Sequence, residues 1–382
     1  MPITTKRAIF VLGFVSFVTL GIYRSLFGPA FALFAERYAI SEASFGLLLS
    51  MNGLGVITAL SLSGALLPRL SYKVFILLGC WLWALGAWGI TLTVPYAWLF
   101  VAVIASGWGG GVLDITINVV FTHTFSRAAP LNIVHAAYGV GAIAGPLIVS
   151  GFFERGLSVP YGLVAVIVVL LFGGFLWLDT SPVPKAASNQ TVAAPKGVFL
   201  TMLGFICLYF GYVGIEAGVG SWMSVHLTPS FGAARAASLT SIYWTSLTVG
   251  RLLGARASQP LGPAQLLLAS TSVAVVGVLI CFYIPFAPIG YALVGLGGGP
   301  VFPTGLLWVR QYFPARASAM MATVMVAATV GGTVVVWLMG RLVERTSVQA
   351  VPSVLFACTL GCLLSVLWLR LQESAVSASQ SG

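Results

Sequence analysis

Long apolar runs separated by short polar stretches follow one another along the whole chain. An α-helix rises 1.5 Å per residue, so a run of about 20 apolar residues is long enough to cross a hydrocarbon core of roughly 30 Å. The pattern therefore predicts an all-α membrane protein with twelve transmembrane helices. Their approximate ranges are 8–36, 43–67, 74–93, 96–122, 131–153, 160–179, 197–225, 236–256, 263–284, 286–311, 317–341 and 349–370.

The composition supports a membrane protein over a soluble one. Of the 382 residues, 59% are hydrophobic and 7% are charged, whereas soluble domains carry about 25% charged residues. A net charge of +10 would suggest a nucleic-acid partner in a soluble protein, but in a membrane protein the placement of the cations matters more than their sum. We expect the chain to be surrounded by the lipid bilayer, to bind no nucleic acid and to function as a monomer.

The Lys and Arg residues gather on one side of the predicted helices. With the amino terminus in the cytoplasm, the inside segments hold eleven of these residues and the outside loops hold five. Cytoplasmic loops of membrane proteins carry an excess of Lys and Arg. We therefore predict a multi-pass protein of the cytoplasmic (inner) membrane with both termini in the cytoplasm.

The two halves of the chain repeat each other. At an offset of 188 residues, the stretch that starts at Gly107, GWGGGVLDITINVVFTHTF, aligns with the stretch that starts at Gly295, GLGGGPVFPTGLLWVRQYF. Two parallel repeats of six helices are the arrangement of the major facilitator fold. The predicted parts are an N-terminal six-helix bundle over 1–179, a cytoplasmic linker over 180–196, a C-terminal six-helix bundle over 197–372 and a disordered tail over 373–382.

Four charged residues lie inside the predicted spans and away from their terminal residues: Arg24, Asp114, Glu216 and Arg251. A charged side chain near the middle of a bilayer costs at least a few kcal/mol, so such residues usually pair with each other or face a wet cavity, and they mark ion and substrate pathways. We predict that Asp114, Glu216 and Arg24 take part in proton coupling. Arg24 is either a counter-ion that releases Asp114 on protonation or a ligand for an anionic substrate.

Polar and aromatic residues share helix faces with these charges. Asn118 follows Asp114 by four residues, and His135 precedes Tyr138 by three with Asn132 one turn earlier, so each set falls on one face. Arg251 lies near the cytoplasmic end of its helix, where it either binds substrate or anchors the helix by snorkelling. By their spacing, the residues predicted to contact substrate are Tyr138, Tyr212, Tyr243, Trp244 and Arg251. The alternative for the four aromatic residues is a position in the core or at the membrane interface.

At these helices the sequence resembles the fucose:proton symporter family of the major facilitator superfamily. The resemblance rests on the D-x-x-x-N of Asp114 and Asn118 and on the stretches PLNIVHAAYGVGAIAGPL, YVGIEAGVGSW, IYWTSLTVGRLLG and VFPTG. It implies Asp114 as the proton-coupling site and substrate contacts from Asn118, Asn132 and His135. The first helix departs from the family, because characterised sugar members have an acid or amide where this chain has Arg24.

The function that the sequence predicts is secondary active transport by alternating access. A sugar or similar small polar solute would move with protons, with sodium as the other possible coupling ion, and without a further cofactor or metal. The alternatives are a proton-coupled exporter of drugs or organic ions, a transporter of organic anions through Arg24, and a non-transporting membrane sensor. We predict no enzymatic activity, because the sequence has no H-E-x-x-H, no paired catalytic aspartates and no nucleophile with a base.

Overall fold

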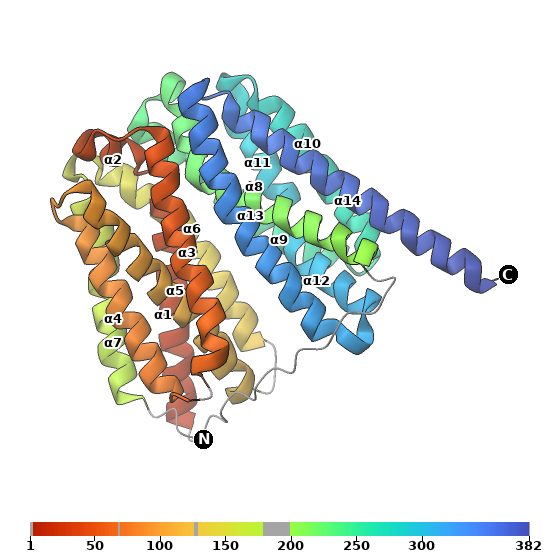
Figure 1. Ribbon diagram of the computed structural model, residues 1–382, viewed down its shortest axis with the longest axis horizontal. Coiled ribbons are helices and arrows are strands. Elements are labelled where there is room, and N and C mark those ends of the chain that lie inside the picture. Colours follow the sequence, from red (N-terminus) through yellow and green to blue (C-terminus); the bar gives the residue numbers. More distant parts are fainter. Residues whose placement is uncertain (1–2, 68, 126–128, 179–198, 382) are drawn as a thin grey trace. The chain divides into compact units, whose positions relative to one another are not determined.

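The computed structural model of the chain describes residues 3–67, 69–125, 129–178 and 199–381, and these described residues form helices joined by short turns (Figure 1). They divide into two compact units, Met1–Gln190 with Ala233–Ser241, and Thr191–Gly232 with Ile242–Gly382. The predicted linker over 180–196 lies outside the described residues. The expected all-α fold class is confirmed.

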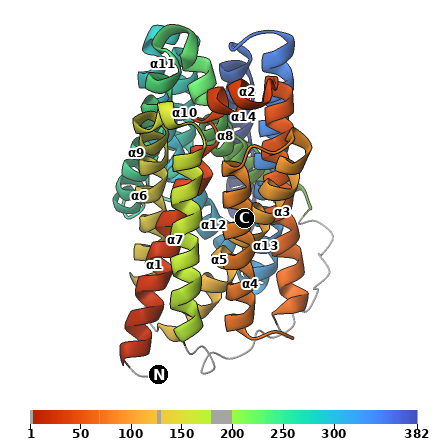
Figure 2. The same ribbon diagram turned by 90° about the vertical axis from the view of Figure 1, so that its left-hand side faces the viewer.

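The first unit contains the helices that precede the linker. α1 packs against α6 and α7, while α3 and α4 both pack against α5; α1 and α7 lie side by side in Figure 2. Ser41 and Ser71 begin α3 and α4, because each side-chain oxygen accepts a hydrogen bond from a backbone N–H of the first turn. The helices are α1 (Ile3–Leu26), α2 (Phe31–Tyr38), α3 (Glu42–Leu66), α4 (Tyr72–Thr91), α5 (Tyr96–Thr124), α6 (Ala129–Gly151), η1 (Phe153–Arg155) and α7 (Ser158–Trp177).

The second unit repeats this arrangement. α8 packs against α13 and α14, and α10 packs against α11 and α14. Gly232 separates α8 from α9 with φ +75°, a backbone conformation that glycine adopts without strain. The helices are α8 (Phe199–Phe231), α9 (Ala233–Ala257, of which Ala233–Ser241 clusters with the first unit), α10 (Pro263–Cys281), η2 (Ile284–Phe286), α11 (Ala287–Gly298), α12 (Val301–Tyr312), η3 (Pro314–Arg316), α13 (Ala317–Arg345) and α14 (Ala350–Ser381).

Glycines allow the same close helix crossing in both units. In the first unit, Gly141 of α6 lies directly against the carbonyl group of Val18 in α1. In the second unit, Gly331 of α13 lies directly against the carbonyl group of Phe210 in α8. Small residues let helix backbones approach where lipid supplies no hydrophobic driving force between helices. The two crossings are equivalent, so α1 corresponds to α8 and Arg24 to the position of Glu216.

Among the described residues, eleven spans are long and apolar enough to cross a membrane. The predicted span that is not among these eleven is 236–256. It corresponds to α9, which has 25 residues but carries three arginines. Large apolar side chains on α7 are exposed, with Trp177 at 92% and Leu170 at 68%, as expected for a surface that faces lipid rather than water. The chain is therefore a multi-pass membrane protein, whereas the full count of twelve spans remains a prediction.

Two predicted spans are interrupted in the structure, and the tail differs from its prediction. The span predicted over 8–36 stops at Leu26, and a turn over 27–30 that contains Pro29 separates α1 from α2. The span predicted over 286–311 divides at Gly299 and Pro300 into α11 and α12, because proline lacks the N–H that would continue the helix. In the structure α14 continues to Ser381, through the tail that the sequence predicts as disordered.

Candidate functional site

The first unit brings two of the predicted charges together. The Arg24 guanidinium of α1 donates from Nη2 to Asp114 Oδ2 of α5 over 3.2 Å, and the two side chains are 35% and 32% exposed. Removing one partner of such a pair is unfavourable, because the other charge is left uncompensated away from bulk water. Arg24 and Asp114 are therefore coupled, and any change in the charge of Asp114 changes what holds Arg24.

Asn118 connects this ion pair to α6. Its Nδ2 donates to the backbone oxygen of Asp114 over 2.7 Å and to Asp114 Oδ1 over 3.1 Å, which uses both N–H groups of the amide. Its Oδ1 lies 2.9 Å from His135 Nε2. An amide oxygen only accepts, so His135 Nε2 carries the hydrogen of this contact. These contacts engage both N–H groups and the oxygen of the Asn118 amide, and the imidazole of His135 at the end of the network is exposed.

The remaining predicted residues of α6 surround the same network. Arg24 lies over the ring of Tyr138, with 5.9 Å from the guanidinium carbon to the ring centroid, which is within the range of a cation–π contact. The His135 ring meets Phe17 of α1 edge-on, with 5.0 Å between centroids. Asn132 is exposed one turn before His135. The structure therefore gathers α1, α5 and α6 around one partly open polar site, which we call the Asp114 site.

The second unit contains a separate charge pair. The Tyr212 hydroxyl donates to Glu216 Oε2 over 2.6 Å, and Arg251 Nη2 donates to the same oxygen over 3.5 Å. Glu216 and Arg251 are 18% and 33% exposed. Arg251 of α9 therefore pairs with Glu216 of α8, and its predicted roles, substrate binding or snorkelling, stay predictions.

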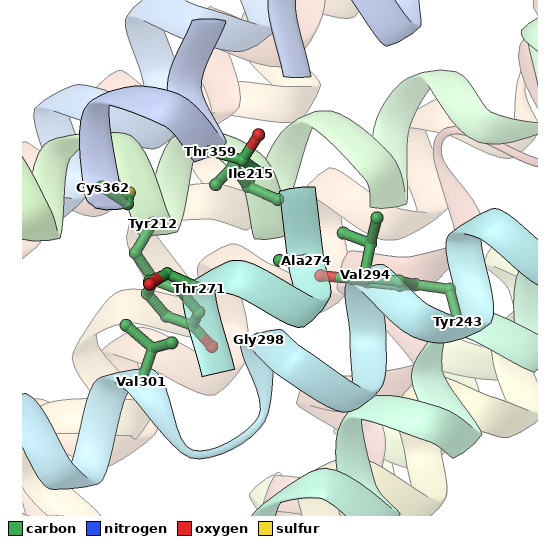
Figure 3. Close-up of a pocket in the computed structure, with 10 residues that line it drawn as sticks. All are labelled: Tyr212, Ile215, Tyr243, Thr271, Ala274, Val294, Gly298, Val301, Thr359 and Cys362. Atoms are coloured by element: carbon green, nitrogen blue, oxygen red, sulfur yellow. The ribbon is translucent and has the colours of Figure 1, made fainter. Parts of the chain in front are cut away.

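The predicted aromatic residues of α9 are buried. Trp244 is 5% exposed, and its ring packs against Gly220 of α8 and against the Tyr243 ring. Tyr243 lines a narrow cavity together with Tyr212 of α8 and Gly298 of α11 (Figure 3). The volume of this cavity is about 10 Å³, which is the room that a single water needs. Tyr243 and Trp244 therefore pack in the interior of this unit, and a sugar does not fit in the cavity that Tyr243 lines.

A polar cluster beside Arg24 was not predicted from the sequence. The Tyr23 hydroxyl hydrogen-bonds to Ser106 Oγ of α5, and Asn52 Nδ2 of α3 donates to the Tyr23 hydroxyl over 3.0 Å and to the Val103 carbonyl over 2.8 Å. The cluster ties α1 to α3 and α5 one residue before Arg24, and so fixes the part of α1 that carries the guanidinium. The signal in the sequence was Asn52, a lone amide in an apolar span.

In the described part of the chain, no three His, Cys, Asp or Glu side chains lie close enough together to hold a metal ion. The chemistry that the Asp114 site offers is proton exchange at a carboxylate, ion pairing with a guanidinium, and hydrogen bonding from His135. These are the means by which a transporter binds a polar solute and a proton at one place.

Comparison with known proteins assigns the fold to a family. Residues 10–292 match the Major Facilitator Superfamily. The chain belongs to this superfamily. Membership makes it a membrane transporter and not an enzyme, and confirms the superfamily expected from the repeat. An uncharacterized MFS-type transporter of Yersinia pestis is 26% identical over 92% of each chain, and the glucose/mannose transporter GlcP of Bacillus subtilis is 22% identical over 90% of each chain.

Solved structures of other major facilitator transporters have the same fold. The nucleoside transporter NupG has a TM-score of 0.75 at 18% identity, covering 96% of this chain and 98% of its own. A variant of the E. coli fucose:proton symporter FucP has a TM-score of 0.62 at 19% identity, covering 94% of this chain and 98% of its own. At these identities the likeness concerns the fold alone.

Proposed function

We propose that the chain is a proton-coupled symporter of a sugar or similar small polar solute, working by alternating access, with Asp114 as the residue that exchanges the proton. The observation that carries this function is the Arg24–Asp114 pair, a partly open carboxylate inside a membrane-spanning helix with a counter-ion that protonation would release. Glu216, held by Tyr212 and Arg251, is the second candidate for proton or substrate binding. The names of GlcP and FucP support a sugar, and that of NupG supports a polar solute that contains one.

The same proposal includes the surroundings of the transporter. The excess of Lys and Arg in alternate loops supports cytoplasmic termini in the inner membrane. The coupling ion is the proton and the functional unit is the monomer. Labelling of single cysteines introduced at residues 6 and 94, in intact cells with an impermeant reagent, distinguishes the two orientations.

Transport into proteoliposomes tests this function. Purified protein with an acid exterior is expected to accumulate labelled sugar above the outside concentration, and a protonophore is expected to abolish the accumulation. Accumulation under a sodium gradient without a pH gradient would assign the coupling to sodium. Binding of a solute without any movement of it would indicate a sensor, and flux only toward the acid side would indicate an exporter.

Tyr212→Phe tests the contribution of the Glu216 site. The variant keeps the buried ring but removes the hydroxyl that donates to Glu216 over 2.6 Å. A hydrogen bond to a charged group contributes about 1.5–3 kcal/mol, so we expect the initial rate of solute exchange to fall by roughly tenfold or more. Tyr38→Phe is the control, because the Tyr38 hydroxyl donates to the Leu92 carbonyl at an exposed position. Equal exchange rates in both variants would show that the hydrogen bond from Tyr212 to Glu216 does not contribute to transport.

A further inference from the structure

The charge of the Asp114 site changes during proton coupling. When Asp114 is ionised, its Oδ2 accepts from Arg24 over 3.2 Å and its Oδ1 accepts from Asn118 over 3.1 Å, so the pair is neutral and both oxygens are engaged. A proton on either oxygen replaces an acceptor with a donor and weakens the contact made there. The pair then carries a net positive charge, located on Arg24.

The groups around the pair leave Arg24 without a second carboxylate. α1 contributes Arg24 beside Tyr23, α6 contributes His135 and Tyr138, and α3 and α4 meet α5 on its glycine face. The other acids described in this unit are Glu36 in α2, Glu42 at the first residue of α3 and Glu154 in η1. Within the described first unit, Asp114 is the acid that pairs with Arg24.

A positive charge without a counter-ion is unfavourable in the interior of a membrane protein. A neutral sugar that binds after the proton leaves Arg24 in this state, because hydroxyl groups do not neutralise a guanidinium. A carboxylate on the solute would take the place of Asp114 and restore neutrality, in the planar two-bond geometry that guanidinium groups favour. The Tyr138 ring, 5.9 Å from the guanidinium carbon, holds Arg24 in place while the carboxylates exchange.

We infer that the solute that moves with the proton carries a carboxylate, as sugar acids do, and that Arg24 binds this carboxylate when Asp114 is protonated. The proton from the solution bonds to a carboxylate oxygen of Asp114, and no other bond forms or breaks. One proton and one anion then cross together, so the loaded transporter moves no net charge through this site. This substrate class presupposes the proton-coupled transport proposed above.

Matched probes separate this inference from its alternatives. Glucose, gluconate and glucuronate have similar size and hydroxyl content, and the last two add a carboxylate. In proteoliposomes with an acid exterior, we expect uptake of a carboxylated probe at least tenfold faster than that of glucose, and unchanged when potassium and valinomycin impose a membrane potential. Faster uptake of glucose, or uptake of the acids that follows the potential, would overturn the inference and leave proton coupling intact. Uptake of none of the three under a pH gradient would count against the proposed function itself and the inference with it.

A double variant tests whether the preference for a carboxylated solute depends on the Arg24–Asp114 pair. Arg24→Gln with Asp114→Asn replaces the ion pair with two amides of similar shape, so no charge is left unpaired. We expect its binding of gluconate or glucuronate to weaken at least tenfold at acid pH and to lose its pH dependence, as measured by titration calorimetry on folded protein. Arg155→Gln, at an exposed position of η1, is the control and should bind as the unmodified chain does. Retention of pH-dependent acid binding by the double variant would refute the role of Arg24 even if all variants fold.

Discussion

Asp114→Asn is expected to abolish the accumulation of solute against its gradient while leaving solute exchange across the membrane. An amide has the shape of a protonated carboxyl group and its oxygen still accepts from Arg24 or Asn118, which contact Asp114 at 3.2 and 3.1 Å. The variant cannot release a proton, so the pH gradient no longer drives the cycle. We expect accumulation in proteoliposomes to fall by about tenfold or more, toward equal concentrations inside and outside.

Exchange measurements make this result specific. Counterflow, in which internal unlabelled solute exchanges for external labelled solute, requires binding and movement but no net proton transfer. Glu154→Gln changes an exposed acid of η1 and is expected to leave both measurements unchanged. Undiminished uphill uptake by Asp114→Asn would mean that the proton binds elsewhere, with Glu216 as the next residue to test.

Gly141→Ala is expected to destabilise the first unit strongly. An added Cβ would lie 2.8 Å from the Val18 carbonyl carbon and 2.9 Å from the Ile22 nitrogen, both of which are backbone atoms of α1. A side chain can rotate away, but a helix backbone must move as a whole, so α1 and α6 would have to separate. Overpacking of this kind costs about 1–3 kcal/mol or more, which corresponds to a fall in Tm of roughly 5 °C.

Thermal unfolding in detergent, followed by tryptophan fluorescence, measures this effect. Gly151→Ala is the matched control in the same helix, because a Cβ there meets nothing within 4 Å. Gly331→Ala makes the equivalent change against Phe210 in the second unit and is expected to lower the Tm similarly. A Tm for Gly141→Ala equal to that of Gly151→Ala would show that α1 and α6 are packed less closely than the structure indicates.

The sequence was sufficient to predict the helices, the repeat and the residues that carry charge. These follow from apolar length, glycine spacing and the cost of charge in a membrane, all of which act along one chain segment. Arg24 and Asp114 were expected to interact because they are the two charges that lie well inside the predicted spans of their half, and the structure places their side chains 3.2 Å apart.

Contacts between helices were harder to predict. The hydrogen bond of Asn118 to His135 and the link of Tyr23 to Asn52 depend on how each helix is rotated about its axis and how deeply it is inserted. Spacing along one helix determines neither quantity. The burial of Trp244 and Tyr243 depends on the same two quantities, because the spacing of aromatic residues along a helix is the same whether they line a cavity or pack in the core.

The break between α11 and α12 has a consequence for mutational scans of this chain. In the aligned repeats, Pro300 corresponds to Val112 and Phe302 to Asp114, so the interrupted backbone of one copy falls at the level where the other copy has its acid. Pro300 and Pro303 supply no N–H to the carbonyls of Leu296 and Gly299. The second copy thus has polar groups at the position that aligns with Asp114, but they are main-chain carbonyls rather than a side chain. Alanine scanning would reveal Asp114 through its lost carboxylate, whereas it would reveal this counterpart only at Pro300 and Pro303, where alanine restores the missing N–H.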